Sequence, residues 1–294
     1  MSSTPEPLLL CPVCEDPLDV EHARCAVLPK NDGGARFLRC RRGHRFDAAR
    51  QGYFNLLTGR GTAFAADTAA MVQARIDFLG SGHFRPLADA LSTAAAEFAV
   101  ERPVVLDVGA GTGYYLAAVR ERVNARAAVA LDISKFALRR AARLLPDALC
   151  LVWDVWRPLP LGEASVDLAL NVFAPRNAPE FARVCRDGAT LLVVTPLPRH
   201  LQEIAEGARL LDIRPGKDND VAASMADGFE TIESRTVEFQ MALSPADVGN
   251  VAAMGPAGHH SAPSEAGFST PASSVTAAFT LQVFRRRIRE VSKT

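Results

Sequence analysis

The chain of 294 residues lacks several features that would set it apart from ordinary globular proteins. Its net charge is zero, because 33 Lys and Arg residues balance 33 Asp and Glu residues. No apolar run approaches the roughly 18 residues that span a bilayer, and the start of the chain lacks the basic stretch of a signal peptide. Six cysteines are too few for a dense disulfide scaffold. These absences predict a cytoplasmic protein without membrane spans.

The composition that remains is typical of folded domains. Apolar residues make up 48% and charged residues 22%, which excludes an intrinsically disordered chain. At about 150 residues per domain, the length allows two units. The beginning of the chain is rich in Cys, Arg and Gly and has little helical periodicity, unlike the rest of the chain. We therefore expect a small N-terminal module over 1–60, a helical linker over 61–101 and a main domain over 102–294.

Two pairs of potential metal ligands lie in this N-terminal module. One is a CxxC pair, the other a CxxxH pair, and the four residues are Cys11, Cys14, Cys40 and His44. Two short-spaced pairs joined by a loop are the usual way to hold tetrahedral zinc, and a segment this small needs such a staple to fold. His22 and Cys25 are alternative ligands. The opposing interpretation is a set of reduced surface cysteines.

Positive charge is concentrated in the same module. From Arg36 to Arg60 there are seven arginines and one acid, Asp47. Such a block is the footprint of phosphate contact, although a solvated face is the simpler alternative. The arginines that we expect to contact phosphates are Arg41, Arg42, Arg45 and Arg50. Tyr53 either stacks on a base or packs the module.

Beyond the module, short apolar strands alternate with helical runs. The strands are VVLDVG, AAVALD, ALCLVWD, SVDLALNVF and ATLLVVTP. Helices are predicted over 67–79, 85–99, 114–123, 135–145, 179–185 and 199–211. Two alternating segments, 229–243 and 274–286, predict an antiparallel hairpin at the sheet edge, and the Gly- and Pro-rich stretch 252–273 predicts a loop. The fold class is therefore α/β, with a doubly wound, seven-stranded and mostly parallel sheet.

A glycine-rich loop follows the first of these strands and precedes a helix. It runs from Asp107 through Gly109, Gly111 and Gly113 to Tyr114. The glycines allow a sharp turn and a close approach of the backbone to a ligand. A dinucleotide-binding fingerprint would need glycine in place of Tyr114, so we favour S-adenosylmethionine over a nicotinamide cofactor. Its sulfonium and amino groups are cationic, and its carboxylate can meet backbone N–H groups.

Two further acids end the next two strands. Asp132 closes the second strand, 19 residues after Gly113, where a carboxylate can accept hydrogen bonds from ribose hydroxyls. Asp154 closes the third strand and can meet an adenine amino group. Each acid alone could be a helix N-cap or a turn residue. Three acids at the carboxyl ends of three successive strands, where open α/β sheets bind ligands, favour a nucleotide-like cofactor.

The fourth strand ends in a tip that faces the reactive end of such a cofactor. Asn171 in this tip offers hydrogen bonds to a base edge. Phe173 either stacks on a base or lies in the core. Arg176 in the same tip is assigned to RNA contact.

Several segments together resemble one known family. CPVC, CRRGHRFDAARQGYFNLL and DTAAMVQARIDFLGSGHFRPL resemble the N-terminal half of bacterial 23S rRNA (guanine-N1)-methyltransferases. LDVGAGTGYY, LDISKFALRRAAR, NVFAPRNAPEFARV and TPLPRHLQEI continue the match, and AMGP resembles the macrolide-resistance branch. The resemblance covers roughly residues 8 to 215 well and the remainder loosely.

The resemblance implies a Rossmann-like class I methyltransferase domain, a zinc-binding target-recognition module and usually a homodimer. The implied substrate is a guanosine in the hairpin 35 loop of 23S rRNA, nucleotide 748 rather than 745. Methylation there in the resistance branch protects against tylosin-type macrolides. By position, the residues that match the zinc ligands are Cys11, Cys14, Cys40 and His44, and those that fall on the cofactor site are Gly109, Gly111, Asp132 and Asp154.

Guanine N1 carries a proton that must leave during methyl transfer. Asn171 cannot remove it but can orient the lactam edge of the base. His200 follows the fifth strand and is a candidate base, with a place in the first turn of a helix as the alternative. Two other functions are weighed: a methyltransferase acting on another RNA or a small metabolite, and a non-catalytic, zinc-dependent RNA-binding protein. The arginine-rich module disfavours the metabolite, and the intact glycine-rich loop disfavours a non-catalytic protein.

Overall fold

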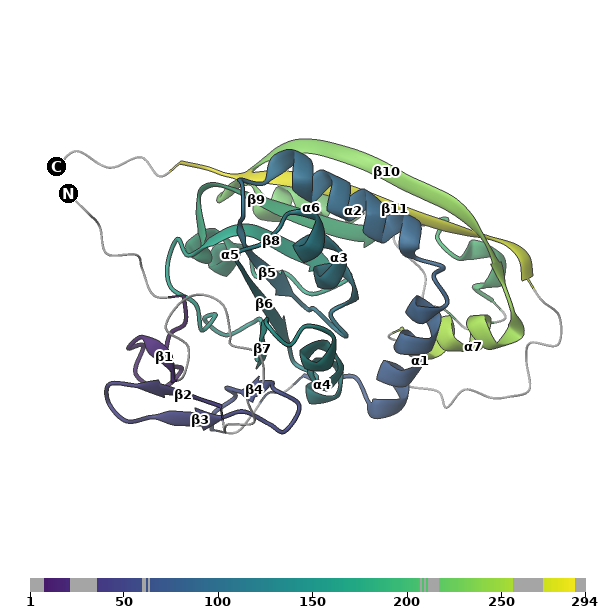
Figure 1. The fold of residues 1–294 in the computed structure, drawn as a ribbon. Helices are drawn as coiled ribbons and strands as arrows, with labels where there is room; N and C mark the ends of the chain where they lie inside the picture. Colours follow the sequence, from purple (N-terminus) through teal and green to yellow (C-terminus); the bar gives the residue numbers. More distant parts are fainter. Residues whose placement is uncertain are drawn as a thin grey trace.

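The computed structural model describes residues 8–21, 36–59, 62, 64–206, 208, 210, 217–255 and 272–288. Within these residues, the central sheet has eight strands in the order β10-β11-β9-β8-β5-β6-β7-β4 (Figure 1). They are β4 (Phe54–Asn55), β5 (Val104–Val108), β6 (Ala127–Asp132), β7 (Leu149–Val152), β8 (Val166–Val172), β9 (Cys185–Pro196), β10 (Phe229–Leu243) and β11 (Ala272–Arg286). The strands from β9 to β4 pair in parallel, and β10 and β11 form an antiparallel hairpin at one edge.

The predicted fold class is confirmed, with one strand more than the seven expected. This strand is β4, which comes from the N-terminal module and pairs in parallel with β7. The N–H of Leu56 continues the pairing by donating to the Val152 carbonyl at 3.2 Å. A strand of two residues has too little periodicity to be found in the sequence. The N-terminal module is thus joined to the main sheet by backbone hydrogen bonds.

The strand order reverses at β5. From this strand the chain moves outward through β6 and β7 on one side, and later through β8 and β9 on the other. In open α/β sheets, such a reversal leaves a crevice at the carboxyl ends of the strands, where ligands bind. The predicted cofactor acids lie at this edge of the sheet.

Helices cover both faces of the sheet. They are α1 (Ala69–Gly80), α2 (Arg85–Phe98), α3 (Tyr114–Arg122), α4 (Lys135–Leu144), α5 (Ala178–Val184), α6 (Lys217–Met225) and α7 (Pro245–Ala253). Successive strand residues point to opposite faces of the sheet and so belong to two apolar cores. Val105 packs with α2, α3 and α4 on one face, and Leu106 packs with α5 and α6 on the other. Both faces are buried, which is why β5 is apolar along nearly its whole length.

The helix predicted over 199–211 is wrong. The described residues form one turn of 3-10 helix there, Gln202–Ile204. Leu201 has a left-handed φ of 57° and its N–H donates to the Thr276 carbonyl at 2.8 Å. The carboxylate of Glu203 accepts the Thr276 N–H at 3.1 Å. The segment therefore forms hydrogen bonds with β11 instead of forming a helix of its own.

Helices α6 and α7 are not foreseen by the apolar pattern. Each has nine residues, too few for a clear helical period. A signal for α7 does exist, because Ser244 and Asp247 form a capping box at its start. Only the first residues of the loop predicted over 252–273 belong to α7, and most of that stretch lies outside the described residues.

The N-terminal module forms its own three-stranded antiparallel sheet. Its strands are β1 (Leu18–Glu21), β2 (Phe37–Cys40) and β3 (Arg45–Asp47). The module also pairs with the loop after β7, where Leu10 N–H donates to the Pro160 carbonyl at 3.1 Å and Gly162 N–H donates to the Leu8 carbonyl at 3.2 Å. His22 and Cys25 lie outside the described residues. Among the helices of the described chain, none is both long and apolar enough to cross a membrane.

Candidate functional site

The four predicted metal ligands, Cys11, Cys14, Cys40 and His44, converge in the N-terminal module, and their ligand atoms all lie within 4.8 Å of one another. Cys14 Sγ is 3.7 Å from Cys40 Sγ, and His44 Nδ1 is 3.6 Å from Cys11 Sγ. A tetrahedral ion with zinc bond lengths places two sulfurs about 3.8 Å apart and a sulfur and a nitrogen about 3.6 Å apart. The residues therefore fit zinc in number, type and spacing.

Tight turns bring the members of each pair together. In the first pair, Glu15 N–H donates to the Cys11 carbonyl at 2.8 Å. In the second, Gly43 N–H donates to the Cys40 carbonyl at 2.9 Å, with a φ of 87° that glycine adopts readily. Burial favours the neutral Cys40 thiol, but hydrogen bonds from its neighbours, chiefly the His44 backbone, lower its pKa to about 7. The turn thus favours a thiolate at a ligand position.

The glycine-rich loop between β5 and α3 turns through left-handed conformations, with φ of 81° at Gly109, 54° at Gly111 and 82° at Gly113. A Cβ on Gly109 would lie 2.2 Å from the Cβ of Ala174, so the tip after β8 rests directly on the loop. Behind the loop, Asp107 is buried, and its Oδ1 has no hydrogen-bond partner in the described chain. Burial, with help from a neighbouring carboxylate, raises the pKa of Asp107 to about 8. A cation at this turn would favour the ionised form of Asp107, so the buried carboxyl and the bare backbone suit a cationic ligand.

The other two predicted acids have different neighbours. Asp132 accepts the N–H of Gly111 at 2.8 Å and that of Ser134 at 2.7 Å, which fixes it against the loop. Each of its oxygens keeps a further lone pair for a ligand. Asp154 accepts the hydroxyl of Thr62 at 2.8 Å and a backbone N–H at 3.0 Å. Asp132 is therefore part of the loop's network, and Asp154 holds the segment that precedes α1.

Asn171 at the end of β8 is fully buried, and its side chain bridges two strand ends. Its Nδ2 donates to the Val108 carbonyl at 3.2 Å and to the Pro175 carbonyl at 2.9 Å. Its Oδ1 accepts from Arg176 at 3.4 Å. Phe173 in the same tip has a φ of 56° and is 43% exposed. The Asn171 amide thus holds the tip in shape, and an aromatic ring is exposed beside it.

His200 belongs to a cluster of aromatic rings next to this tip. Its ring centroid is 4.5 Å from that of Phe279 and 5.9 Å from that of Phe84, and the Phe279 centroid is 5.4 Å from that of Phe173. Nδ1 of His200 accepts the Ala278 N–H at 3.3 Å, and burial lowers the pKa of this imidazole to about 4. This contact assigns the proton to Nε2 of a neutral ring. His200 precedes the 3-10 turn rather than standing in the first turn of a helix.

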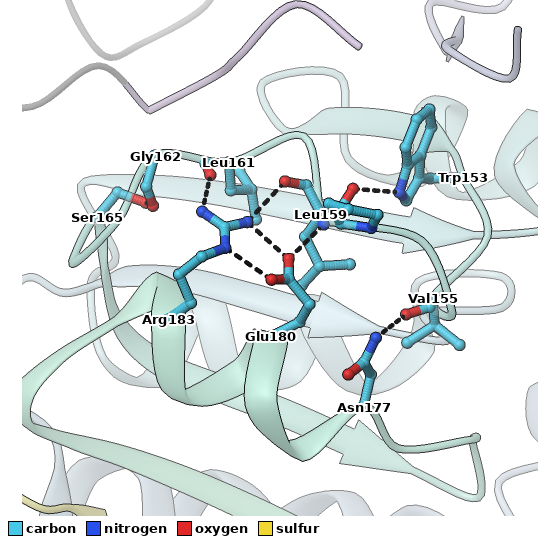
Figure 2. A network of polar contacts seen from close by, with 10 residues as sticks. Trp153, Val155, Leu159, Leu161, Gly162, Ser165, Asn177, Glu180 and Arg183 are labelled. Atoms are coloured by element: carbon cyan, nitrogen blue, oxygen red, sulfur yellow. Dashed lines mark hydrogen bonds and ion pairs between the residues drawn. The ribbon is translucent and has the colours of Figure 1, made fainter. Parts of the chain in front are cut away.

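A polar network fixes the loop between β7 and β8 (Figure 2). Glu180 on α5 accepts the Leu159 N–H at 2.5 Å and forms an ion pair with Arg183 at 2.7 Å. The Arg183 guanidinium donates to the carbonyls of Leu159 and Leu161, each at 2.9 Å. The same loop begins next to Asp154 and pairs with the N-terminal module. Helix α5 therefore fixes the loop that follows Asp154 and with which the N-terminal module pairs.

A cavity of about 430 Å³ opens next to Ile133, the residue that follows Asp132. It lies at the ends of β4, β6 and β7 and against the start of α1. Its lining residues are Asn55, Leu57, Ala66, Asp67, Thr68, Ala69, Ile133, Lys135, Phe136 and Val152. Its volume and its place at the carboxyl ends of parallel strands suit part of a nucleotide-like ligand.

Comparisons with known proteins assign a family to each of the two parts of the chain. A methyltransferase-domain family matches residues 105–193, and a zinc-ribbon family described as RlmA, N-terminal, matches residues 9–59. The 23S rRNA (guanine(748)-N(1))-methyltransferase of Streptomyces fradiae is 45% identical over 84% of this chain and 89% of its own length. The chain belongs to the 23S rRNA (guanine-N1)-methyltransferase family.

Two further comparisons fit this methyltransferase family. A Micromonospora griseorubida protein with the provisional name 23S rRNA (guanine-N(1)-)-methyltransferase is 45% identical over 95% of the chain and 97% of its own length. A chain in the solved complex between the Haloferax volcanii Trm112 methyltransferase activator and a methyltransferase aligns with a TM-score of 0.53 and 17% identity, over 77% of this chain and 100% of that one. The second similarity concerns the fold alone.

The zinc-ribbon match includes all four converging ligands. Zinc is therefore a cofactor of this methyltransferase. Four protein ligands leave no open position on the ion, so its role is structural.

The predicted RNA-contacting arginines of the N-terminal module are all exposed: Arg41, Arg42, Arg45 and Arg50. Two of them already meet acids of the module. Arg42 pairs with Asp16 at 3.1 Å, and Arg45 pairs with Asp47 at 2.7 Å while lying 3.8 Å above the Phe37 ring. Exposed ion pairs contribute little, so these arginines can exchange an acid for a phosphate at small cost.

Two other predicted RNA contacts, Arg176 and Tyr53, are less exposed than these arginines. Arg176 is half-buried in the tip after β8, where it also donates to the Ala174 carbonyl at 3.2 Å and burial lowers its pKa. Tyr53 is half-buried next to β4 and packs against the main core. The structure thus brings Arg176 to the cofactor edge and gives Tyr53 packing contacts.

At the carboxyl ends of the strands, where the predicted cofactor acids lie, the structure places other residues that the sequence patterns did not predict. The Tyr115 hydroxyl on α3 is buried and has no hydrogen-bond partner in the described chain. Arg75 on α1 lies over the glycine-rich loop, where its Nη1 would be 3.8 Å from a Cβ on Gly111. Both stand in segments whose only sequence signal is helical periodicity. The one sequence signal for Arg75 is that it places a positive charge within the apolar pattern of α1.

Proposed function

We propose that this methyltransferase transfers a methyl group from S-adenosylmethionine to N1 of the guanosine at position 748, in the hairpin 35 loop of 23S rRNA. The observation that carries the proposal is the 45% identity, over 84% of the chain, with a Streptomyces fradiae enzyme whose name specifies guanine 748. Two further features support it: the exposed arginines of the N-terminal module, and the crevice with its cavity at the carboxyl ends of the parallel strands. Nucleotide 745 is the alternative target, and protection against tylosin-type macrolides is the proposed physiological result.

In this proposal, the cofactor lies along the carboxyl ends of β5, β6 and β7. Bound S-adenosylmethionine supplies an electrophilic methyl group on a sulfonium sulfur. The orphaned Asp107 faces its cationic part, and the remaining lone pairs of Asp132 accept the ribose hydroxyls. The cavity next to Ile133 takes the adenine, and Asp154 fixes the neighbouring segment. Gly109 and Gly111 let the ligand approach the backbone, and Gly113 and Tyr114 start the helix that supports the loop.

The target guanine must leave its stack to expose N1, which costs a few kcal/mol and least for a loop base. In the transfer, the bond from N1 to the methyl carbon would form as the bond from that carbon to sulfur breaks, S-adenosylhomocysteine would leave, and the N1 proton would pass to solvent water. The exposed ring of Phe173 offers the base a stacking face, and Asn171 positions this ring through its contacts with the neighbouring strand ends. His200 is neutral with Nδ1 engaged, so it presents an N–H donor rather than a proton acceptor. We therefore propose that His200 positions the base rather than deprotonates it.

Methylation of naked 23S rRNA by the pure protein, followed by reverse transcription through hairpin 35, tests the proposal. N1-methylation blocks the Watson–Crick edge, so we expect one new stop at nucleotide 748 that is absent without S-adenosylmethionine. A stop at nucleotide 745 instead would show that the enzyme methylates the alternative target. Absence of any stop, despite measured cofactor binding, would favour another RNA or a small metabolite. RNA binding without cofactor binding would favour a non-catalytic RNA-binding protein.

A second prediction concerns the arginine surface. We expect the double variant Arg41→Glu/Arg50→Glu to bind the hairpin more weakly and with a flatter salt dependence. Each lost phosphate contact reduces the slope of log K against log salt by about 0.7–0.9, so the double variant should lose about 1.5. Filter binding at several salt concentrations measures this slope.

Arg102→Glu is the matched control, because Arg102 is an exposed arginine outside the N-terminal module, just before the amino end of the central strand β5. Its slope should equal that of the wild type. Zinc content should be one ion per chain in all three proteins. An unchanged slope in the double variant would remove these two arginines from the interface.

The proposal also includes a homodimer in the cytoplasm. We propose that the second copy binds along β10, one of the two outer strands of the described sheet, whose 15 residues offer a long backbone edge.

A further inference from the structure

Arg75 on α1 occupies a central position at the cofactor edge. Its guanidinium forms an ion pair with Asp67, just before α1, and Nη2 donates to the Met254 carbonyl at 2.7 Å. Nη1 would lie 3.8 Å from a Cβ on Gly111, so the cation lies against the second glycine of the loop. It is also near Asp132, since its charge opposes the rise that burial causes in the pKa of Asp132.

Four backbone N–H groups of the loop are already engaged within the protein. The N–H groups of Gly109 and Ala110 both donate to the Leu131 carbonyl, at 2.7 and 3.0 Å. The N–H of Gly113 donates to the Ala110 carbonyl at 2.8 Å. Asp132 takes the N–H of Gly111. These four amides are thus used inside the protein and do not point to a ligand.

We propose that Arg75 binds the carboxylate of the methionine part of S-adenosylmethionine. The inference rests on the proposed cofactor site. A guanidinium has five N–H donors, and the contacts with Asp67 and Met254 occupy two of them. The remaining donors can form a charge-assisted pair with a carboxylate that lies over Gly111. The contact also links cofactor binding to α7, because Met254 is the C-cap residue of this helix.

Calorimetric titration with two ligands tests the assignment. S-adenosylhomocysteine carries the carboxylate, and 5′-deoxy-5′-methylthioadenosine has the same nucleoside thioether without the amino acid. We expect Arg75→Gln to bind S-adenosylhomocysteine about 10- to 100-fold more weakly, the usual range for a hydrogen bond to a charged group. Binding of methylthioadenosine should stay within about twofold of the wild type. Arg75→Lys, which keeps the charge but not the fork, should lose less.

Arg140→Gln is the matched control, because Arg140 also contacts α1, through Gln73 at 3.0 Å, but lies on α4. Its affinity for both ligands should equal that of the wild type. An equal loss of both ligands in Arg75→Gln would show a general disturbance of the site and overturn the assignment, as would no loss of either. The wild-type protein could bind methylthioadenosine and have no higher affinity for S-adenosylhomocysteine. This result would refute the contact between Arg75 and the carboxylate but not the proposed cofactor site. If the protein binds neither, the proposed cofactor site fails as well.

Discussion

Gly109→Ala is expected to be one of the two most damaging substitutions in the chain. A left-handed backbone costs a non-glycine residue about 1–2 kcal/mol. In addition, the new Cβ would lie 2.2 Å from the Cβ of Ala174, and overpacking of this kind costs about 1–3 kcal/mol. The tip after β8 must move away from β5. We expect the free energy of unfolding to fall by about 2–5 kcal/mol and methyl transfer to fall at least tenfold, as measured by denaturant titration and by reverse transcription.

Two further variants separate the two causes. Gly188→Ala has the same kind of left-handed backbone, with φ of 78°, but its Cβ meets nothing within 4 Å. It should show the backbone cost alone and retain methyl transfer. Gly109→Ala combined with Ala174→Gly removes the opposing Cβ and leaves the next atom at 3.6 Å, so most of the activity should return. If the double variant is no better than Gly109→Ala, contact between the tip and the loop is not the cause.

Loss of zinc is expected to be the other large effect. Cys40→Ser removes one of four ligands from a module whose sheet is small, and structural zinc contributes about 10–16 kcal/mol of apparent binding energy in comparable peptides. We expect the variant to purify without zinc and to methylate the hairpin more than 100-fold more slowly, because even outer-shell changes at zinc sites cost about 10–100-fold. Metal analysis and the stop assay measure the two quantities.

Cys150→Ala is the control for this substitution. Cys150 is also a buried free cysteine, but it lies on β7, outside the metal cluster. The variant should keep one zinc per chain and most of its activity. Chelation of zinc from the wild-type protein should reproduce the effect of Cys40→Ser. A Cys40→Ser protein with full zinc content would show that another residue, such as Cys25, completes the site.

The sequence predicts the parts of this fold that depend on local pattern. The parallel strands are buried on both faces, so their apolar runs are continuous and bounded by turns. The zinc ligands and the glycine-rich loop are also local, because chemistry and backbone geometry fix their spacing. Ser244 and Asp247 show that a local signal can also be overlooked, since their capping box marks α7.

Other features depend on contacts between distant segments and could not be predicted in this way. β4 exists because β7 offers a free edge, and the segment after Leu201 bonds to Thr276 on β11 instead of forming a helix. The state of His200 follows from Ala278 and Phe279, which approach it only in the folded chain. Arg75 reaches the glycine-rich loop through the packing of α1. Periodicity carries no information on such pairings.

The pairing of β4 with β7 has a consequence for how a target nucleotide is chosen. Because β4 is a strand of the sheet whose edge carries Asp107 and Asp132, the arginines and the reacting centre share one rigid frame. In the proposed complex, a stem held by the arginines offers a single nucleotide at the correct reach. A neighbour three positions along a stacked strand lies roughly 10 Å away. The enzyme would then select its target by the distance between the bound stem and the methylated nucleotide, as a ruler does. It would need no base-specific contacts with the nucleotides in between.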